Sequence, residues 1–580
     1  MVQLSEFSFR TRERAFRRFR DEKFDLFIVG GGITGAAVAR DAATRGLKVA
    51  LVDKNDFAWG TSSRSSKLIH GGLRYLQNME LGLVFESLSE RAFLLKTSPH
   101  MVRPVPFYFP VYQGDKPGRA ILGMGMWLYD VLALFRAGLH KNYSPAKLLE
   151  LIPSLKKEGL RGGFRYFDAS MWDDGLTVST LRAAHDCGAA VANYAEAVGP
   201  LWHGDRITGF RVRDLELPRG QGEIDVQATQ VVICAGPWTD QVGAGLSQKW
   251  RKWLAPSKGV HLVFDLKRFP LPGAVVMNSP ADGRIAFAIP RPDFGEGVTI
   301  VGTTDGPSPE RPESAEVDHE DVDYLMKLVH AYFPALDLQE SDILSAYVGV
   351  RPLMGPVGPS GNEEDGPLQK VSREHHIDEG PGGTVVVAGG KYTTHRTMAE
   401  EIVEFALKLR ARDARQGKCD PVPREITSSK TRTPINPRAT REAIESTRRE
   451  LESKGLGVPE ELLGRYGSEA KIVLDLQTHH ATEVGSAEKR AISKQDPEGF
   501  PALAAQLRFT MRSEMVLHLE DFYLRRIPLF LARADHGLPW AEALARVWAE
   551  ERGLGEEEAQ SELARLRKEM EKRSFWSSHE

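Results

Sequence analysis

The chain has 580 residues, of which 41% are hydrophobic and 27% charged, a globular composition that excludes a disordered or collagen-like protein. Lys and Arg total 76 against 79 for Asp and Glu, and the net charge of −3 argues against a nucleic-acid-binding protein. At about 150 residues per domain, the length predicts two to four domains.

The cysteines are few and scattered. Cys187, Cys234 and Cys419 include no CxxC pair. They offer neither a disulfide framework nor a metal site, which fits a reducing compartment. The first 24 residues contain no apolar core of a secretory signal, so we expect a cytoplasmic protein.

Residues 7–23 are basic and aromatic. From Arg10 to Lys23 there are seven basic and three acidic residues, with Phe16 and Phe19 among them. The simpler interpretation is a solvated helix that packs both phenylalanines on the domain behind it. The alternative is contact with an anionic membrane surface.

A strand, a helix and a second strand follow in quick succession. FDLFIV (24–29) is a short apolar run typical of a strand buried on both faces. The small residues of 33–45 suit a helix packed closely on a sheet, and KVALV (48–52) is the next strand. This pattern predicts a βαβ unit.

The turn of this unit is rich in glycine. Gly30, Gly32 and Gly35 satisfy GxGxxG between the first strand and the helix, and Asp53 ends the second strand. Glycines at these positions bring a pyrophosphate close to the backbone and the helix N-terminus, while the acid accepts hydrogen bonds from the adenosine ribose. The unit therefore predicts a dinucleotide site.

Two later strands bear on which dinucleotide is bound. The strands within 231–236 and 384–390 both end in small residues, where a backbone can meet a ligand. Strand ends that return late in the chain suit a cofactor that spans the sheet, which favours FAD over NAD. Each alone could also be an ordinary strand that ends in glycine.

The remainder of the chain contains an apolar stretch, a region of short strands and a helical region. The most apolar stretch, 120–139, is interrupted by two charges and falls short of the ~20 unbroken apolar residues of a spanning helix, so we predict an amphipathic or buried helix. Short strands with Pro and Gly turns over 241–344 indicate an antiparallel sheet. Residues 413–437 resemble a linker, and helical spacing dominates from 438 onward.

Six motifs occur along the chain: GTSSRSSKLIHGGLRYL (60–76), CAGPW (234–238), SKGVH (257–261), GTTD (302–305), VGVRPL (348–353) and GGKYTTHR (389–396). Together they resemble the FAD-dependent glycerol-3-phosphate dehydrogenases. These respiratory enzymes oxidise sn-glycerol 3-phosphate to dihydroxyacetone phosphate and pass the electrons to quinone. DFYLRR (521–526) is similar to a segment of the same family's C-terminal domain.

The resemblance implies an α/β protein with three units. A doubly wound FAD-binding domain of the D-amino-acid-oxidase type would comprise 24–105, 160–240 and 345–412. An antiparallel-sheet substrate domain would comprise 106–159 and 241–344, and an all-helical C-terminal domain 430–580.

The resemblance also implies the site residues. FAD would be bound by Gly30, Gly32, Gly35, Asp53, Thr61, Ser62, Ser66, Lys67, Leu68, His70, Gly236, Trp238, Gly390, Lys391 and Thr393. The substrate would be bound by Arg74, Tyr75, Thr303, Arg351 and Lys391. Arg74 and Arg351 are the candidates for its phosphate, because guanidinium groups supply fixed charge and paired donors.

Catalysis requires a group that takes the proton of the C2 hydroxyl while the C2 hydride moves to the flavin. Histidine has a suitable pKa, and His261 is the preferred base, with His70 second. Arg351 and Lys391 complete the expected catalytic set. Lys258 or Lys391 could stabilise the negative charge of reduced flavin.

The electron acceptor is the main point on which related enzymes differ. An oxidase would use O2 and release H2O2, but no extra block of the oxidase kind separates the motifs, which favours quinone. An amine oxidase of the glycine-oxidase type would share the fold but lack the basic residues suited to a phosphate. A non-catalytic flavin scaffold would not retain so many site residues.

A quinone acceptor implies peripheral contact with the inner face of the cell membrane, because quinone resides in the bilayer. The basic segment 9–20 and the apolar stretch 121–135 are the candidate contact surfaces. A homodimer is possible.

Overall fold

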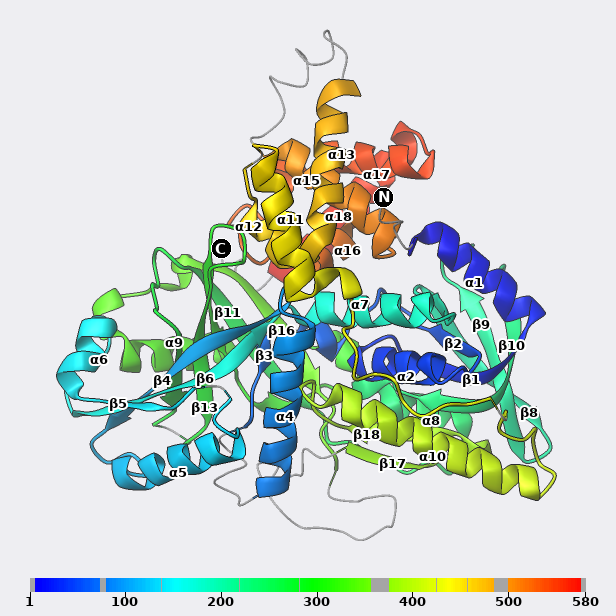
Figure 1. Cartoon of the computed structure of the whole chain (residues 1–580), viewed down its shortest axis with the longest axis horizontal. Helices are drawn as coiled ribbons and strands as arrows, with labels where there is room; N and C mark the ends of the chain where they lie inside the picture. The colour runs from blue at the N-terminus through cyan, green and yellow to red at the C-terminus, as the bar shows by residue number, and fades with distance from the viewer. Residues whose placement is uncertain are drawn as a thin grey trace.

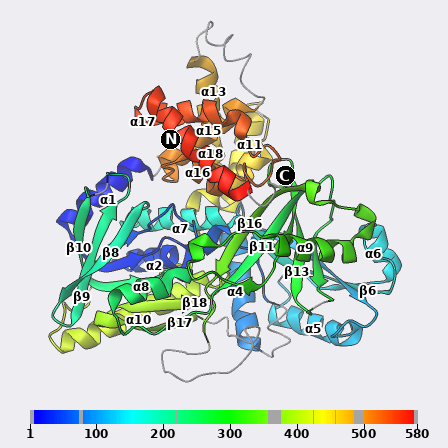
Figure 2. The same ribbon diagram turned by 180° about the vertical axis from the view of Figure 1, so that it is seen from behind.

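The computed structural model describes residues 6–72, 80–136, 138–218, 220–280, 282–355, 375–423, 425–455, 457–483 and 499–574. Two β-sheets lie side by side, and helices of the C-terminal part of the chain sit above both of them (Figure 1). The view from behind shows the same arrangement (Figure 2).

The first sheet has the strand order β17-β18-β10-β1-β2-β7. Its parallel strands are β1 (Lys23–Val29), β2 (Val49–Val52), β7 (Ala190–Ala192), β10 (Glu223–Ile233) and β18 (Val385–Gly389). β17 (His375–Glu379) is an antiparallel edge, while β8 (Ala195–His203) and β9 (Arg206–Asp214) form an antiparallel hairpin next to β10.

Helices cover both faces of this sheet. One face packs against α2 (Ile33–Thr44), α7 (Asp173–Asp186) and α10 (His395–Arg415), and the other against α1 (Phe9–Asp21), α8 (Thr239–Leu246) and the β8–β9 hairpin. β2 and β18 consist only of small and apolar residues, as expected for strands whose two faces are both covered. The predicted βαβ unit and doubly wound fold are confirmed, and α1 buries Phe16 and Phe19 as the simpler interpretation expected.

The second sheet has the order β15-β11-β14-β13-β12-β4-β6-β3, with β16 on β11 and β5 on β6. Its strands are β3 (Leu68–Ile69), β4 (Val102–Tyr112), β5 (Lys141–Tyr143), β6 (Leu160–Met171), β11 (Ser257–Asp265), β12 (Ala274–Asn278), β13 (Ile285–Arg291), β14 (Val298–Gly302), β15 (Gly306–Pro307) and β16 (Ile343–Arg351). The pairing is antiparallel except between β12 and β4, which run parallel.

The second sheet draws on segments that the sequence assigned to the flavin domain. Residues 160–171 form β6 beside β4, and 345–351 belong to β16 beside β11. A strand's hydrophobic pattern shows that it is buried but not which sheet it joins, because pairing partners are set by packing between distant segments. The chain therefore crosses between the two sheets more often than the predicted boundaries allow.

Helices also cover the second sheet. α4 (Leu81–Thr97) and α5 (Arg119–Leu132) pack on one face, and α6 (Pro145–Leu151) and α9 (His319–Tyr332) on the other. α5 is the helix predicted over 120–139, although it ends at Leu132. No helix in the described ranges is both long enough and apolar enough to cross a membrane.

The C-terminal part is helical, as predicted. It contains α11 (Arg441–Ser453), α12 (Glu460–Tyr466), α13 (Ala470–Glu483), α15 (Phe500–Ser513), α16 (Leu519–Asp521), α17 (Ala541–Arg552) and α18 (Glu556–Ser574). It contacts both sheet units: Arg182 of α7 pairs with Glu469, and the Ser345 hydroxyl of β16 donates to the Leu531 carbonyl. We refer to this part as the helical domain.

Candidate active site

A cavity of about 910 Å³ lies between the two sheets. On one side it is bounded by the carboxyl ends of the parallel strands, at Gly30, Asp53 and Cys234, and on the other by His261 and Arg351 of the second sheet. Ligands of open α/β sheets bind at the carboxyl ends of the strands. One end of the cavity is thus lined by residues predicted to bind the cofactor, and the other end by residues predicted to bind the substrate.

The glycine turn is shaped by close backbone contacts. A Cβ at Gly30 would lie 2.5 Å from the Cys234 carbonyl oxygen, and one at Gly35 would lie 1.9 Å from the Gly30 oxygen. The Ile33 N–H, in the first turn of α2, donates to the Ser62 hydroxyl at 2.9 Å. Glycine is therefore required at both positions, and the turn leaves the N-terminus of α2 at the cavity.

Asp53 is held by the backbone around it. Its carboxylate accepts hydrogen bonds from the N–H groups of Gly31 at 2.6 Å and Asn55 at 2.8 Å. Burial raises the pKa of Asp53 to about 7, even though both hydrogen bonds act in the opposite direction. A half-buried carboxylate at this place, open to the cavity, is suited to accept hydrogen bonds from ribose hydroxyls.

Arg64 is a cavity residue that we did not single out from the sequence. Its guanidinium lies over the Trp59 ring, 4.6 Å from the centroid, and no described carboxylate is within ion-pair distance of it. Burial lowers the pKa of Arg64 to about 9, with nearby Arg573 and Arg525 adding to the effect. The one available signal was its place inside the GTSSRSSK motif, where a single arginine stands among hydroxyl residues.

His261 lies on β11 with its ring almost parallel to that of Tyr347, at a centroid distance of 4.6 Å. Its Nε2 is 2.9 Å from the Ser66 hydroxyl, and the residue is only 3% exposed. Burial, followed by the charges of Arg351 and Lys67, lowers the pKa of His261 well below its usual value. The ring is therefore neutral at neutral pH and able to accept a proton.

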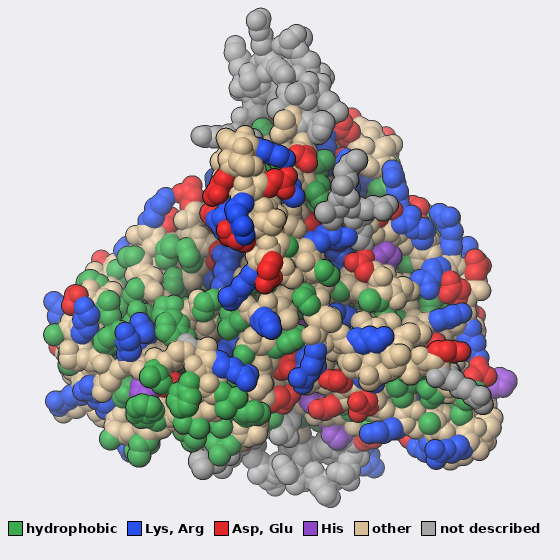
Figure 3. Space-filling model, in the orientation of Figure 1, with side chains coloured by type: hydrophobic (Ala, Val, Ile, Leu, Met, Phe, Trp, Pro, Cys, Tyr) green, Lys and Arg blue, Asp and Glu red, His purple; other side chains and the backbone are tan. Residues whose placement is uncertain are grey.

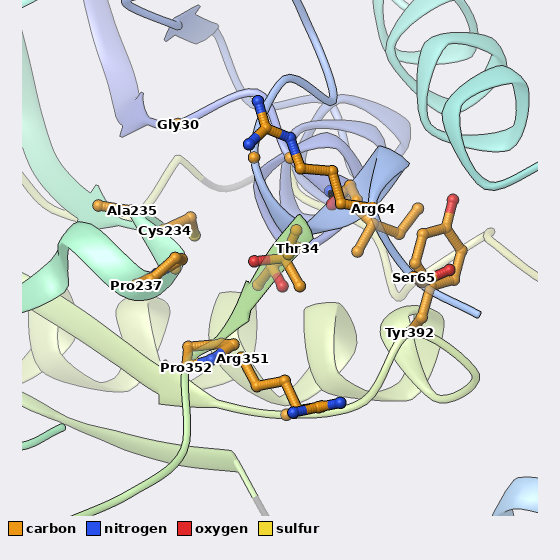
Figure 4. Close-up of a pocket in the computed structure, with 18 of the residues that line it drawn as sticks. Gly30, Thr34, Arg64, Ser65, Cys234, Ala235, Pro237, Arg351, Pro352 and Tyr392 are labelled. Carbon is orange, nitrogen blue, oxygen red and sulfur yellow. Dashed lines mark hydrogen bonds between the residues drawn. The ribbon is translucent and has the colours of Figure 1, made fainter. Parts of the chain in front are cut away.

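Arg351 is fixed at the end of β16. Its guanidinium donates to the hydroxyls of Ser257 at 3.1 Å and Thr303 at 2.9 Å, and lies 3.3 Å from an Asp305 oxygen. A Cβ at Gly259 would lie 2.3 Å from the guanidinium, so glycine makes room for it. In Figure 4 the guanidinium groups of Arg64 and Arg351 lie on opposite sides of the pocket, Arg64 on the side of Gly30.

Most of the remaining predicted site residues also line this cavity. They are Gly32, Thr61, Ser62, Ser66, Leu68, His70, Gly236, Trp238, Thr303, Gly390, Lys391 and Thr393. Arg74 and Tyr75 lie outside the described residues. Gly35 lies behind the turn against Gly30, where it permits the close helix–strand packing.

Two lysines differ from their expected roles. Lys67 does not line the cavity; its ammonium donates to the Asp173 carboxylate at 2.6 Å and to the Ser63 carbonyl at 3.0 Å. Lys258 pairs with Asp318 at 2.5 Å and Asp321 at 2.7 Å, also away from the cavity. The suggestion that Lys258 stabilises reduced flavin is therefore wrong, because its strand turns that side chain toward α9.

The dinucleotide turn, the acid at the end of the second strand and the two-sheet cavity define an FAD-dependent oxidoreductase. The family model of that description, FAD dependent oxidoreductase, matches residues 25–404, and a model described as the C-terminal domain of alpha-glycerophosphate oxidase matches residues 445–559. The cavity fits FAD because the glycine turn leaves no room for side chains where the pyrophosphate approaches.

Proteins similar in sequence identify the family more closely. An aerobic glycerol-3-phosphate dehydrogenase of Staphylococcus saprophyticus is 34% identical over 93% of this chain and 92% of its own length. The protein of the same name from Bacillus subtilis is 35% identical over 90% of each chain. The chain therefore belongs to the family of FAD-dependent glycerol-3-phosphate dehydrogenases.

Solved structures agree with this placement. The glycerol-3-phosphate dehydrogenase of Bacillus halodurans, solved with FAD, has a TM-score of 0.75 and 28% identity and covers 99% of both chains. The L-alpha-glycerophosphate oxidase of Mycoplasma pneumoniae, also with FAD, shares the fold at a TM-score of 0.52 and 17% identity, over 66% of this chain and 95% of its own.

Proposed function

We propose that this protein oxidises sn-glycerol 3-phosphate to dihydroxyacetone phosphate and passes the electrons to a membrane quinone. The observation that carries the proposal is that His261 and Arg351, on the paired strands β11 and β16, face the cavity into which the dinucleotide turn opens. A proton acceptor and a fixed cation within one cavity suit a phosphorylated alcohol. The names of the relatives in Staphylococcus and Bacillus support the same substrate.

The residues at the cofactor end each have a role in holding FAD. Gly30, Gly32 and the N-terminus of α2 would receive the pyrophosphate, and Asp53 the adenosine ribose. Arg64 adds a half-buried positive charge that the pyrophosphate would neutralise. When bound, FAD supplies the acceptor for the hydride.

At the substrate end, Arg351 would bind the phosphate. The hydroxyls of Ser257 and Thr303 and the Asp305 carboxylate already hold the guanidinium in one orientation, so little rotamer freedom is lost on binding. Lys391, which follows Gly389 and Gly390 at the cavity wall, would contribute a second cation.

His261 would accept the proton of the C2 hydroxyl. The acceptor is Nε2, the nitrogen that now lies against the Ser66 hydroxyl, which also lines the cavity. Stacking on Tyr347 fixes the plane of the ring. Burial and nearby cations lower the pKa of His261, so the ring is neutral over the physiological pH range and Nε2 can offer its lone pair to the proton.

A surface feature supports quinone as the acceptor. Four large apolar side chains lie along one exposed face of α5: Ile121, Met124, Trp127 and Val131, with exposed fractions of 60%, 65%, 56% and 49%. Figure 3 shows hydrophobic side chains gathered at the lower left, where Figure 1 places α5. An apolar helix face with exposed Lys116, Arg136 and Lys141 nearby suits the headgroup layer of a membrane.

The test uses the purified holoenzyme. Under anaerobic conditions glycerol 3-phosphate should bleach the flavin absorbance, and glycerol, which lacks the phosphate, should not. A soluble quinone or dichlorophenolindophenol should then be reduced much faster than peroxide appears in air. Failure of glycerol 3-phosphate to bleach the flavin would refute the substrate, and peroxide release at the dye-reduction rate would replace quinone with O2.

A further inference from the structure

The segment DFYLRR (521–526) of the helical domain has no part in the chemistry above. It begins at the end of α16 and continues as a π-helical turn over Phe522–Arg526. The wider turn directs the adjacent side chains of Arg525 and Arg526 to the same place, a carboxylate of the flavin domain. Both arginines are buried.

That carboxylate is Asp56. Its Oδ2 accepts from Nε of Arg525 at 2.6 Å and from Nη1 of Arg526 at 2.9 Å, and its Oδ1 accepts from Nη2 of Arg526 at 3.0 Å and from the Asn193 amide at 3.1 Å. Asp521 shares in the cluster, accepting from Arg525 at 2.7 Å and from the Tyr194 hydroxyl at 2.6 Å.

Asp56 belongs to the loop 53–59, which begins at the ribose-binding Asp53; we refer to it as the cofactor loop. The Trp59 N–H donates to the Asp56 carbonyl at 3.2 Å, and the Ala58 N–H donates to the Gly31 carbonyl at 3.2 Å. A Cβ at Gly31 would lie 2.7 Å from the Phe57 ring. The loop is thus closed directly on the glycine turn, with Asp56 as its anchor.

Burial alone would raise the pKa of Asp56, but the charges of Arg526 and Arg525 outweigh burial and lower it. Such buried ion clusters add little net stability compared with apolar packing, since desolvation cancels much of the attraction. What they do supply is a defined geometry, because three or more directional hydrogen bonds must be satisfied together. Here the defined geometry is that of the cofactor loop.

We propose that Arg525 and Arg526 are positioning residues for the cofactor: by anchoring Asp56 they hold the cofactor loop in the shape that presents Asp53 and the glycine turn to FAD. The helical domain thereby controls how tightly FAD is retained, although none of its described residues lines the cavity. The inference depends on FAD but not on the identity of the substrate or acceptor.

The experiment compares Arg525→Lys, Arg526→Lys and Asp56→Asn with a matched control, Arg182→Lys. Arg182 makes a similarly buried two-pronged pair with Glu469, at 2.8 and 2.6 Å, between the flavin and helical domains, and neither side chain is hydrogen-bonded to the cofactor loop. The FAD dissociation constant is measured by flavin fluorescence on the full-length chain, without substrate, and folding is followed by circular dichroism.

Loss of one charge-assisted hydrogen bond should raise the FAD dissociation constant about tenfold in the Arg525, Arg526 and Asp56 variants. Arg182→Lys should lower the melting temperature comparably while leaving the FAD dissociation constant within about twofold. The KM for glycerol 3-phosphate of the FAD-saturated variants should be unchanged.

Unchanged FAD affinity in the two lysine variants, or equal FAD loss in the Arg182 control, would show that these contacts only join the domains, and the proposal would be wrong. If Asp56→Asn does not fold, the Arg525→Lys and Arg526→Lys variants, which keep the positive charge, still test the proposal. Because FAD binding is measured without substrate, the result is independent of the proposed reaction.

Discussion

At the level of single residues, the cavity contains two groups whose protonation is governed by burial. Asp53 has a pKa of about 7 and His261 a pKa well below its usual value, in both cases because the surroundings exclude water. The same exclusion favours binding and proton transfer within the cavity, since hydrogen bonds and charges act more strongly there than in water. Substitutions of His261 and Arg64 therefore give the most direct tests of the site.

Replacement of His261 by Asn removes the proposed base while keeping a polar side chain of similar size. We expect kcat to fall about 100- to 10,000-fold, the range attributed to general acid–base catalysis, with the flavin still bound. Anaerobic stopped-flow measurement of flavin bleaching follows this step directly. A near-normal kcat with an unchanged pH profile would rule His261 out.

Arg64→Gln should weaken FAD binding, because the pyrophosphate would lose the guanidinium that is proposed to pair with it. A charge-assisted hydrogen bond is worth about 1.5–3 kcal/mol, so the FAD dissociation constant should rise about tenfold or more. Titration of the apoprotein, repeated at high salt, measures this and should show a weaker salt dependence in the variant.

Arg311→Gln is the matched control for Arg64, since Arg311 also lines the cavity but is solvated and paired with Glu313. It should leave FAD affinity unchanged. If instead Arg64→Gln retains FAD and raises the KM for glycerol 3-phosphate, Arg64 serves the substrate phosphate and not the cofactor.

At the level of secondary-structure elements, α1 and α5 were both membrane candidates from the sequence. In the structure α1 buries Phe16 and Phe19 against the first sheet, and the residues it exposes are charged ones of both signs, among them Arg10, Glu13 and Arg17. α5 is apolar on both sides: Leu122 and Met126 pack inward while Met124 and Trp127 face outward. The structure thus favours α5, because burial removes Phe16 and Phe19 from any contact with lipid.

Two acidic substitutions on the exposed face of α5, Met124→Glu with Trp127→Glu, should abolish most membrane binding. Burying one large apolar side chain contributes about 1.5–3 kcal/mol, so the bound fraction at limiting lipid should fall about tenfold or more. Sedimentation with liposomes containing anionic lipid measures the effect, and dye-linked activity should be unchanged.

Trp202→Glu is the control for α5, because Trp202 is similarly exposed, at 49%, but lies on β8 of the first sheet. Equal loss of liposome binding in the control, or no loss in the α5 variant, would contradict the assignment of α5 to the membrane.

At the level of the whole molecule, a histidine joins the flavin and helical domains. His518 lies between Glu216 of the flavin domain at 2.9 Å and Glu562 of α18 at 3.1 Å, with Arg565 at 3.0 Å and the Tyr194 ring against it. Burial would lower its pKa, but the hydrogen bonds to both glutamates prevail and raise the pKa to about 9.

Because the folded chain holds this proton more tightly than the unfolded chain, His518 should stabilise the protein fully below pH 6.5, its unfolded pKa, and lose this contribution as the pH rises through about 9. The difference amounts to about 3 kcal/mol. Thermal unfolding of His518→Gln at a series of pH values should show lower stability at neutral pH and a flatter decline over that window.

His203→Gln, which changes an exposed histidine on β8, should leave both the stability and its pH dependence unaltered. If the stability of His518→Gln depended on pH as that of the wild type does, other titrating groups, and not His518, would account for the pH dependence.

Sequence analysis located the dinucleotide turn and the helical domain, because each depends on residues near one another in the chain. It assigned β6 and β16 to the wrong sheet, because the hydrophobic pattern of a strand does not identify its partner. It also suggested that Lys258 stabilises reduced flavin, whereas this side chain pairs with Asp318 at the start of α9. It left out Arg64, because the motif does not show whether a carboxylate of another segment pairs with this arginine.

By itself, the sequence determined the βαβ unit, its glycine turn and Asp53, since a strand, a turn and a helix form through contacts between neighbouring residues. Only the tertiary structure decided that Ser66 meets His261, which is 195 residues away, and that Asp56 meets Arg526, which is 470 residues away. Those contacts depend on how the sheets and the helical domain pack, and packing between distant segments leaves no periodic or local mark on the chain.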